Sequence, residues 1–239
     1  MQTATIALKT ADGTMDVYEA RADTPARGAT IVVQEAFGVN DHIRDVTRRF
    51  ASAGYHAIAP AFFHRAGGGT APYGDFAKVL PLFEGLSDDG ILMDVDAAVA
   101  YLERAGFDLA RIAIVGFCFG GRVTFLTAVR RRLGAAVGFY GGGLVHARFP
   151  IFPALLGESS YLQTPWLGLF GDKDESIPVA DVEQLRETLA RDAKVAHEIV
   201  RYPDAAHGFH CDVRPEYHAA SAQDAWRRTL AWLEQYLPR

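Results

Sequence analysis

The segment that decides the fold reads Arg111-Ile112-Ala113-Ile114-Val115-Gly116-Phe117-Cys118-Phe119-Gly120-Gly121. Residues 111–115 form a short run rich in β-branched residues, which is typical of a strand buried on both faces of a parallel sheet. Glycines then stand two residues before and two residues after Cys118, and a helix is predicted to follow. The segment therefore predicts a strand–turn–helix elbow whose central side chain projects above the end of the sheet.

Cys118 is the candidate nucleophile of this elbow. Glycine at positions 116 and 120 removes the Cβ atoms that would clash in so tight a turn. A cysteine at a helix N-terminus has its thiolate stabilised by the helix dipole and by unpaired N–H groups, and the thiolate is the reactive form. The alternative is a small, inert cysteine buried between packing glycines. The flanking pattern favours the nucleophile.

The rest of the chain alternates short apolar runs with helical patterns, which indicates a mostly parallel sheet with helices on both faces. Further strands are predicted at residues 14–20, 29–35, 56–59, 135–140, 164–170 and 197–201, and helices at 41–53, around 91–102, after Pro178 and at 222–237. Residues 62–86 fit neither period and contain several aromatic residues and three consecutive glycines, which suits a lid or a pocket-lining excursion. We expect one α/β domain over residues 1–239, with about 7–8 strands.

Composition excludes several classes of protein. The chain carries 24 Lys and Arg against 29 Asp and Glu, a net charge of −5, which argues against a nucleic-acid binder. No segment reaches the ~20 apolar residues of a membrane-spanning helix. The first residues lack a basic segment leading into an apolar one, and two cysteines are too few for a disulfide scaffold. These features predict a cytoplasmic protein without a membrane or nucleic-acid partner, and a monomer is the default expectation.

A nucleophile at such an elbow needs an acid and then a histidine later in the chain. Asp172 and Asp174 lie in the loop after the strand at 164–170, and His207 lies in the loop after the last strand. Catalytic side chains of open parallel sheets gather at loops of this kind. His207, followed by a glycine, is the favoured base, and His210 is its rival.

Other kinds of site fit the sequence less well. The glycine pattern at 116–121 and the run Gly141-Gly142-Gly143 both fail the dinucleotide-binding pattern, and no phosphate-binding lysine follows either. A metal site made of His207, His210 and Cys211 has no familiar ligand spacing. A thiol-redox protein would need a C-x-x-C motif, which is absent. We therefore expect neither a cofactor nor a metal.

Over essentially its whole length, the chain resembles the dienelactone hydrolase family of the α/β-hydrolase fold. Four motifs carry the resemblance, in the family's order: Gln34-Glu35-Ala36-Phe37-Gly38-Val39-Asn40, the cysteine elbow at 116–121, Gly171-Asp172-Lys173-Asp174 with Pro178 four residues on, and Ala206-His207-Gly208-Phe209. A lone cysteine elbow would be a weak indication. Four motifs in order make a strong one.

The resemblance implies a role for each matching residue. Cys118 would be the nucleophile and His207 the base, and Asp174 would be the orienting acid because the family's aspartate stands four residues before the proline. Glu35 would hold the resting thiol and move when substrate arrives. The oxyanion hole would consist of the backbone N–H groups of Phe119, the residue after the nucleophile, and of Ala36. The implied reaction is hydrolysis of a small ester or lactone through an acyl-enzyme. The alternative is a non-catalytic small-molecule receptor, although a receptor has no need of Cys118, Asp174 and His207 together.

One departure from the family concerns substrate charge. Family members that hydrolyse dienelactone bind its carboxylate with arginines, one of them four residues after the catalytic histidine, where this chain has Cys211. The excursion at 62–86 offers only Arg65 and Lys78 as cations, so we expect neutral esters or lactones to be preferred. The candidate substrate contacts are Arg65, Tyr73, Phe76, Tyr140, Phe209 and Cys211.

Overall fold

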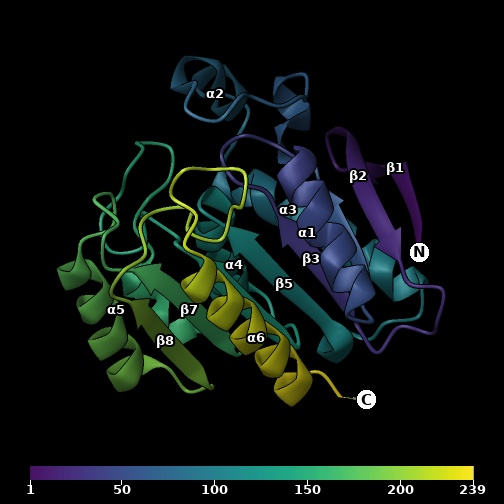
Figure 1. Cartoon of the computed structure of the whole chain (residues 1–239). Helices are drawn as coiled ribbons and strands as arrows, with labels where there is room; N and C mark the ends of the chain where they lie inside the picture. Colours follow the sequence, from purple (N-terminus) through teal and green to yellow (C-terminus); the bar gives the residue numbers. More distant parts are fainter. Residues whose placement is uncertain (239) are drawn as a thin grey trace.

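The computed structural model describes residues 1–238 and joins eight strands in one sheet (Figure 1). The strand order is β1-β2-β4-β3-β5-β6-β7-β8. Pairing is antiparallel between β1 and β2 and between β2 and β4, and parallel across the rest of the sheet. The prediction of a mostly parallel sheet of about 7–8 strands is confirmed. The strands are β1 (Gln2–Thr10), β2 (Gly13–Arg21), β3 (Ala29–Val33), β4 (His56–Pro60), β5 (Ile112–Phe117), β6 (Ala135–Phe139), β7 (Trp166–Gly171) and β8 (His197–Tyr202).

The centre of the sheet forms the core. Every residue of β3, β4, β5, β6 and β7 is buried. Continuous apolar runs rather than alternating ones are what a sheet covered on both faces requires. The elbow segment therefore begins in the most buried part of the molecule, which holds it rigidly.

Helices cover both faces of the sheet, as predicted. The connection from β3 through α1 (Asp41–Ser52) to β4 crosses the sheet in the opposite direction to those through α3 (Asp88–Arg104), α4 (Phe119–Arg130) and α5 (Val179–Asp192). Because such crossovers are right-handed, α1 lies on one face and these three helices on the other. The last helix, α6 (Ala219–Tyr236), joins α1, with the rings of Phe50 and Trp226 4.6 Å apart (Figure 1).

The excursion at residues 62–86 contains the short helix α2 (Phe76–Phe83), which stands apart from the main helical layers (Figure 1). Three 3₁₀ helices complete the fold, namely η1 (Phe62–Ala66), η2 (Leu109–Arg111) and η3 (Leu156–Tyr161). α2 buries Val79 and Phe83 and leaves Phe76 and Leu80 exposed. Among the described residues 1–238, no helix is both long and apolar enough to cross a membrane.

Candidate active site

The elbow is built as its glycines require. β5 ends at Phe117, α4 begins at Phe119, and Cys118 between them has φ +54°, a left-handed conformation that costs backbone strain in a residue other than glycine. A Cβ atom at position 116 would lie 2.1 Å from the carbonyl oxygen of Gly120, and one at position 120 would lie 2.5 Å from that of Val33. Larger residues at these two positions would push the turn apart.

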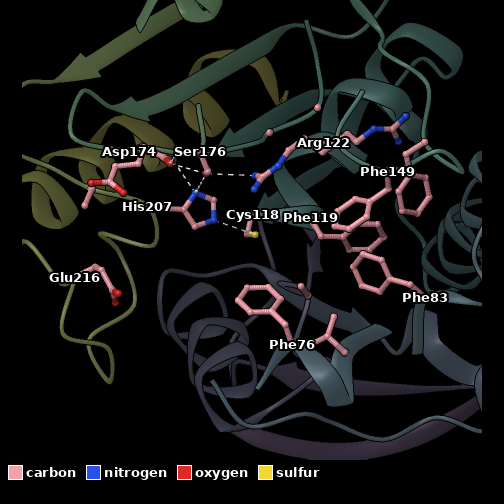
Figure 2. Close-up of a pocket in the computed structure, with 18 of the residues that line it drawn as sticks. Phe76, Phe83, Cys118, Phe119, Arg122, Phe149, Asp174, Ser176, His207 and Glu216 are labelled. Atoms are coloured by element: carbon pink, nitrogen blue, oxygen red, sulfur yellow. Dashed lines mark hydrogen bonds and ion pairs between the residues drawn. The ribbon is translucent and has the colours of Figure 1, made fainter. Parts of the chain in front are cut away.

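Cys118, His207 and Asp174 come together at the carboxyl ends of β5, β7 and β8 (Figure 2). His207 Nε2 lies 3.0 Å from Cys118 Sγ, and His207 Nδ1 lies 2.6 Å from Asp174 Oδ2. Asp174 is buried, whereas Cys118 is partly accessible. A nucleophile hydrogen-bonded to a base, which is in turn held by a buried acid, is the geometry of covalent catalysis.

Ser176 belongs to the same array and was not predicted. Its hydroxyl lies 2.6 Å from Asp174 Oδ1, its backbone N–H donates to the same oxygen, and the hydroxyl is also 3.4 Å from His207 Nδ1. An aspartate that accepts from the backbone two residues on is a common turn pattern, and the spacing Asp174-x-Ser176 was the available indication. Ser176 fixes the orientation of the carboxylate.

The electrostatics of the array favour a protonated imidazole. Burial by itself lowers the pKa of His207, but the negative charges of the Cys118 sulfur and the Asp174 carboxylate outweigh it and raise the pKa to about 10. Burial raises the pKa of Asp174, but the hydrogen bond from His207 and those from Ser176 outweigh it, so that pKa is lowered. These shifts favour the charged forms of both groups, the Asp174 carboxylate and the His207 imidazolium.

The rival histidine and the rival aspartate lie elsewhere. His210 is buried against the rings of Phe117 and His42, and burial together with the charge of His42 lowers its pKa to about 3. Asp172 binds Arg201 through two hydrogen bonds of 2.7 Å. His210 and Asp172 form no hydrogen bond with Cys118 or His207.

Glu35 follows the end of β3 and is fully buried. Its nearest charged partner in the described chain is Arg214, whose Nη1 lies 3.8 Å from Oε1, and no hydrogen bond reaches either carboxylate oxygen from residues 1–238.

The two residues expected to form the oxyanion hole, Ala36 and Phe119, both line the cavity in front of Cys118. Phe119 opens α4, so its N–H has no carbonyl to bind within the helix and is free for a ligand.

Cys118, His207 and Asp174 open onto a cavity of about 470 Å³. Its walls come from the segment after β3, α2, the start of α4, the loops before and after β7, and the loop after β8. Figure 2 shows Asp174, Ser176 and His207 on one side of Cys118, and Phe119, Phe83 and Phe149 on the other. The cavity thus has a polar side and an aromatic side, with the sulfur between them.

Of the six candidate substrate contacts, only Phe76 lines the cavity. Arg65 is a correction to the prediction: it binds Asp12 and the fully buried Asp94 through hydrogen bonds of 2.6–3.0 Å. This guanidinium neutralises a buried carboxylate and supports the fold. A single sequence could not show that Asp94 faces it.

The other four candidates pack behind the cavity. Tyr140 and Phe209 are fully buried. The Tyr140 ring is centred 5.1 Å from that of His207 and supports the imidazole from behind, and Phe209 packs against Tyr140 with ring centres 5.3 Å apart. Cys211 is also buried; its sulfur donates to the Tyr73 hydroxyl at 3.4 Å, and burial followed by the charge of Glu35 raises its pKa to about 11. These residues are corrected from substrate contacts to packing residues.

The excursion at 62–86 brings no cation to the cavity, but other segments do. Within the described chain, four cationic side chains line the cavity, all outside residues 62–86, namely Arg122, Arg148, Lys173 and Arg214. No local pattern marks them, because they come from four distant segments. The expected preference for neutral substrates loses this support.

A parallel sheet bearing a strained cysteine elbow, a histidine loop after its last strand and an acid loop after the strand before defines an α/β hydrolase. The model of the Dienelactone hydrolase family matches residues 15–237. The chain belongs to this family and is a hydrolase of ester or lactone bonds.

Individual relatives agree with the family match. A protein of Escherichia coli (strain K12) described as "Putative carboxymethylenebutenolidase" is 44% identical over 232 residues, covering 93% of this chain and 83% of that protein. A crystal structure described as "Putative Dienelactone Hydrolase", from Klebsiella pneumoniae subsp. pneumoniae, has 41% identity and a TM-score of 0.88, and covers 98% of this chain and 99% of that one. The dienelactone hydrolase-like phosphotriesterase P91, from metagenomic libraries, shares the fold at a TM-score of 0.79 and 20% identity, covering 99% of each chain.

Proposed function

We propose that this protein hydrolyses carboxylic esters or lactones by acyl transfer through Cys118, with His207 as acid–base and Asp174 as the orienting acid. The observation that carries the proposal is the continuous contact Cys118 Sγ–His207 Nε2–His207 Nδ1–Asp174 Oδ2, with distances of 3.0 and 2.6 Å. The high pKa of His207 supports an imidazolium beside Cys118 that can give a proton to the leaving group.

Catalysis begins when the Cys118 thiolate attacks the substrate carbonyl. The backbone N–H groups of Ala36 and Phe119 stabilise the negative oxygen of the tetrahedral intermediate. His207 Nε2 gives its proton to the departing alkoxide as the C–O bond breaks and the thioester remains. A water molecule then loses a proton to His207 and attacks the thioester, and the C–S bond breaks to release the carboxylic acid and the Cys118 thiolate.

Glu35 has a different role in this proposal. In family members, the matching glutamate holds the resting thiol, and here its buried carboxylate has no hydrogen-bond donor among residues 1–238. The structure shows Cys118 turned to His207 instead. We propose that Glu35 is the alternative partner of the thiol and that Arg214, 3.8 Å away, stabilises its charge when the thiol leaves.

A panel of esters and lactones, each with and without a carboxylate, tests the function. The relatives from Escherichia coli and Methylorubrum extorquens carry the description "Putative carboxymethylenebutenolidase", so dienelactone belongs in the panel. We expect turnover of at least one class, and a covalent acyl adduct on Cys118 when the reaction is quenched and the intact protein is weighed by mass spectrometry. Tight binding of a panel compound without turnover or adduct would favour a non-catalytic receptor.

The pH profile of kcat/KM tests the role of the imidazolium. Above the pKa of His207, about 10, the imidazolium loses the proton that the leaving group needs, so kcat/KM should stay high through neutral pH and fall as pH rises through that value. Asp174→Asn removes a negative charge that raises this pKa, so the basic limb should move to lower pH. A basic limb that the substitution leaves in place would contradict the assignment of His207 as the acid.

A further inference from the structure

The cavity has an aromatic side and a polar side, and Cys118 lies between them. On the side opposite His207, the rings of Phe83, Phe119, Phe149 and Phe152 form one cluster, which we call the phenylalanine wall. The Phe83 ring is centred 5.4 Å from that of Phe119, 5.5 Å from that of Phe149 and 6.0 Å from that of Phe152. Exposed Leu80 and Phe76 also line the cavity and extend its apolar lining to the mouth.

One cation that lies over this wall is already neutralised. Arg122 lies over the Phe152 ring at 4.9 Å, and its two terminal nitrogens bind Asp88 at 2.6 and 2.9 Å and the Pro153 carbonyl at 2.7 Å. The charge of Arg122 is therefore neutralised by Asp88 within the protein. The His207 side instead presents Ser176 and Glu216, which are polar, and Arg148, which donates a hydrogen bond to the Ser176 hydroxyl.

The proposed mechanism determines which half of a substrate meets which side. His207 must protonate the leaving oxygen, so the alcohol part lies beside His207, with the polar groups. The carbonyl carbon is bonded to Sγ in the intermediate, so the remainder of the acyl group extends away from His207. In Figure 2 that direction leads to Phe119, Phe83 and Phe149.

From this arrangement we infer that the phenylalanine wall is an acyl-binding site, and that the preferred substrates are esters of apolar acids, of medium length or aromatic, with a small or polar alcohol part. The inference rests on the proposed acyl transfer and deepens it. Burying the acyl chain against aromatic rings removes apolar surface from water. Because that contact forms on the acyl side alone, the enzyme should distinguish the two ends of an ester.

Two isomeric esters separate the ends of the substrate. Ethyl hexanoate and hexyl acetate have the same composition and similar alcohol leaving groups, but carry the long chain on opposite sides of the carbonyl. We expect kcat/KM, measured by titrating the released acid, to favour ethyl hexanoate by about tenfold or more, since each buried methylene contributes about 0.8 kcal/mol and about 1.4 kcal/mol is a factor of ten. Equal values, or a preference for hexyl acetate, would overturn the acyl-binding site.

Variants of the wall locate the preference. Phe149→Ala, at the partly exposed rim, should lower kcat/KM for ethyl hexanoate several-fold and leave hexyl acetate unchanged, and Phe83→Leu should reduce the same preference with little change in volume. Tyr161→Ala removes an exposed aromatic ring outside the cavity and serves as the matched control, without effect on either ester. If the wall variants lowered kcat/KM equally for both esters, or for neither ester, the assignment of the wall as the acyl-binding site would be wrong.

A charged acyl chain provides the remaining comparison. Monoethyl adipate is ethyl hexanoate with the terminal methyl group replaced by a carboxylate, and we expect it to be the poorer substrate because the wall is aromatic and the cation over it, Arg122, is already paired with Asp88. A preference for monoethyl adipate would overturn the apolar assignment. Failure of the acyl-binding site is distinguishable from failure of the function: in the first case both isomers are cleaved equally through Cys118, and in the second no ester or lactone acylates it.

Discussion

Cys118→Ala should abolish turnover, by at least about 10⁴-fold, while leaving the fold intact. The substitution removes the atom that forms the acyl bond, and His207 and Asp174 cannot replace it. Alanine is smaller than cysteine and introduces no clash in the elbow, so circular dichroism and the thermal midpoint should stay close to wild type. Steady-state rates on the best ester of the panel provide the measurement.

Alkylation gives an independent check on the same residue. Iodoacetamide should inactivate the wild type with one adduct, on Cys118, since Cys211 is buried and its raised pKa of about 11 keeps it a neutral thiol. Cys211→Ala is the matched control and should retain activity and remain sensitive to the reagent. Substantial turnover by the Cys118→Ala enzyme would refute covalent catalysis at this position.

Asp174→Asn should lower kcat by orders of magnitude, as much as about 10⁴-fold, because a triad acid acts through its charge and through the tautomer it selects. Asp174 is buried and accepts from His207 Nδ1 at 2.6 Å. An amide there can present an N–H to the imidazole and favour the wrong tautomer. The rate of release of a good leaving group, at a pH below the basic limb, is the appropriate measurement.

Asp172→Asn is the matched control, since it makes the same chemical change two residues away. Asp172 is paired with Arg201, so this variant should lose only the modest stability of a partly exposed ion pair, about 1 kcal/mol or less, and keep kcat within a few-fold of wild type. Thermal denaturation would report the first effect and steady-state kinetics the second. The reverse pattern, with Asp172 essential, would show that the acid has been assigned to the wrong residue.

The strands and helices of the core could be predicted well because their signals are local. β3, β5, β6 and β7 are continuous apolar runs, and the predicted ranges coincide with the observed ones to within a few residues. β1 (Gln2–Thr10) was not among the predicted strands. It is an edge strand with mostly exposed side chains, so no apolar alternation marks it, and its backbone pairing with β2 stabilises it.

What the sequence determined by itself is the elbow and the order of its partners. The tight turn around Cys118 requires glycine at positions 116 and 120, because a Cβ atom at either position would clash with the backbone. These two glycines lie within five residues of each other, so a short sequence pattern is enough to predict the turn. The loops with Asp174 and His207 follow successive strands of a parallel sheet, and such loops meet at one edge whatever the intervening helices contain. Local steric requirements and chain order sufficed here.

The tertiary structure alone decided which neighbours those residues have. Asp172 and Asp174 share a loop, and only the positions of Arg201 and His207 distinguish them. Arg65 is bound to Asp94, which lies 29 residues away in the chain, and is therefore not available for substrate. The cations and aromatic rings of the cavity likewise come from segments far apart in the chain. The pairing of charges and the walls of a cavity are properties of side chains that meet through folding, and no spacing along one sequence specifies them.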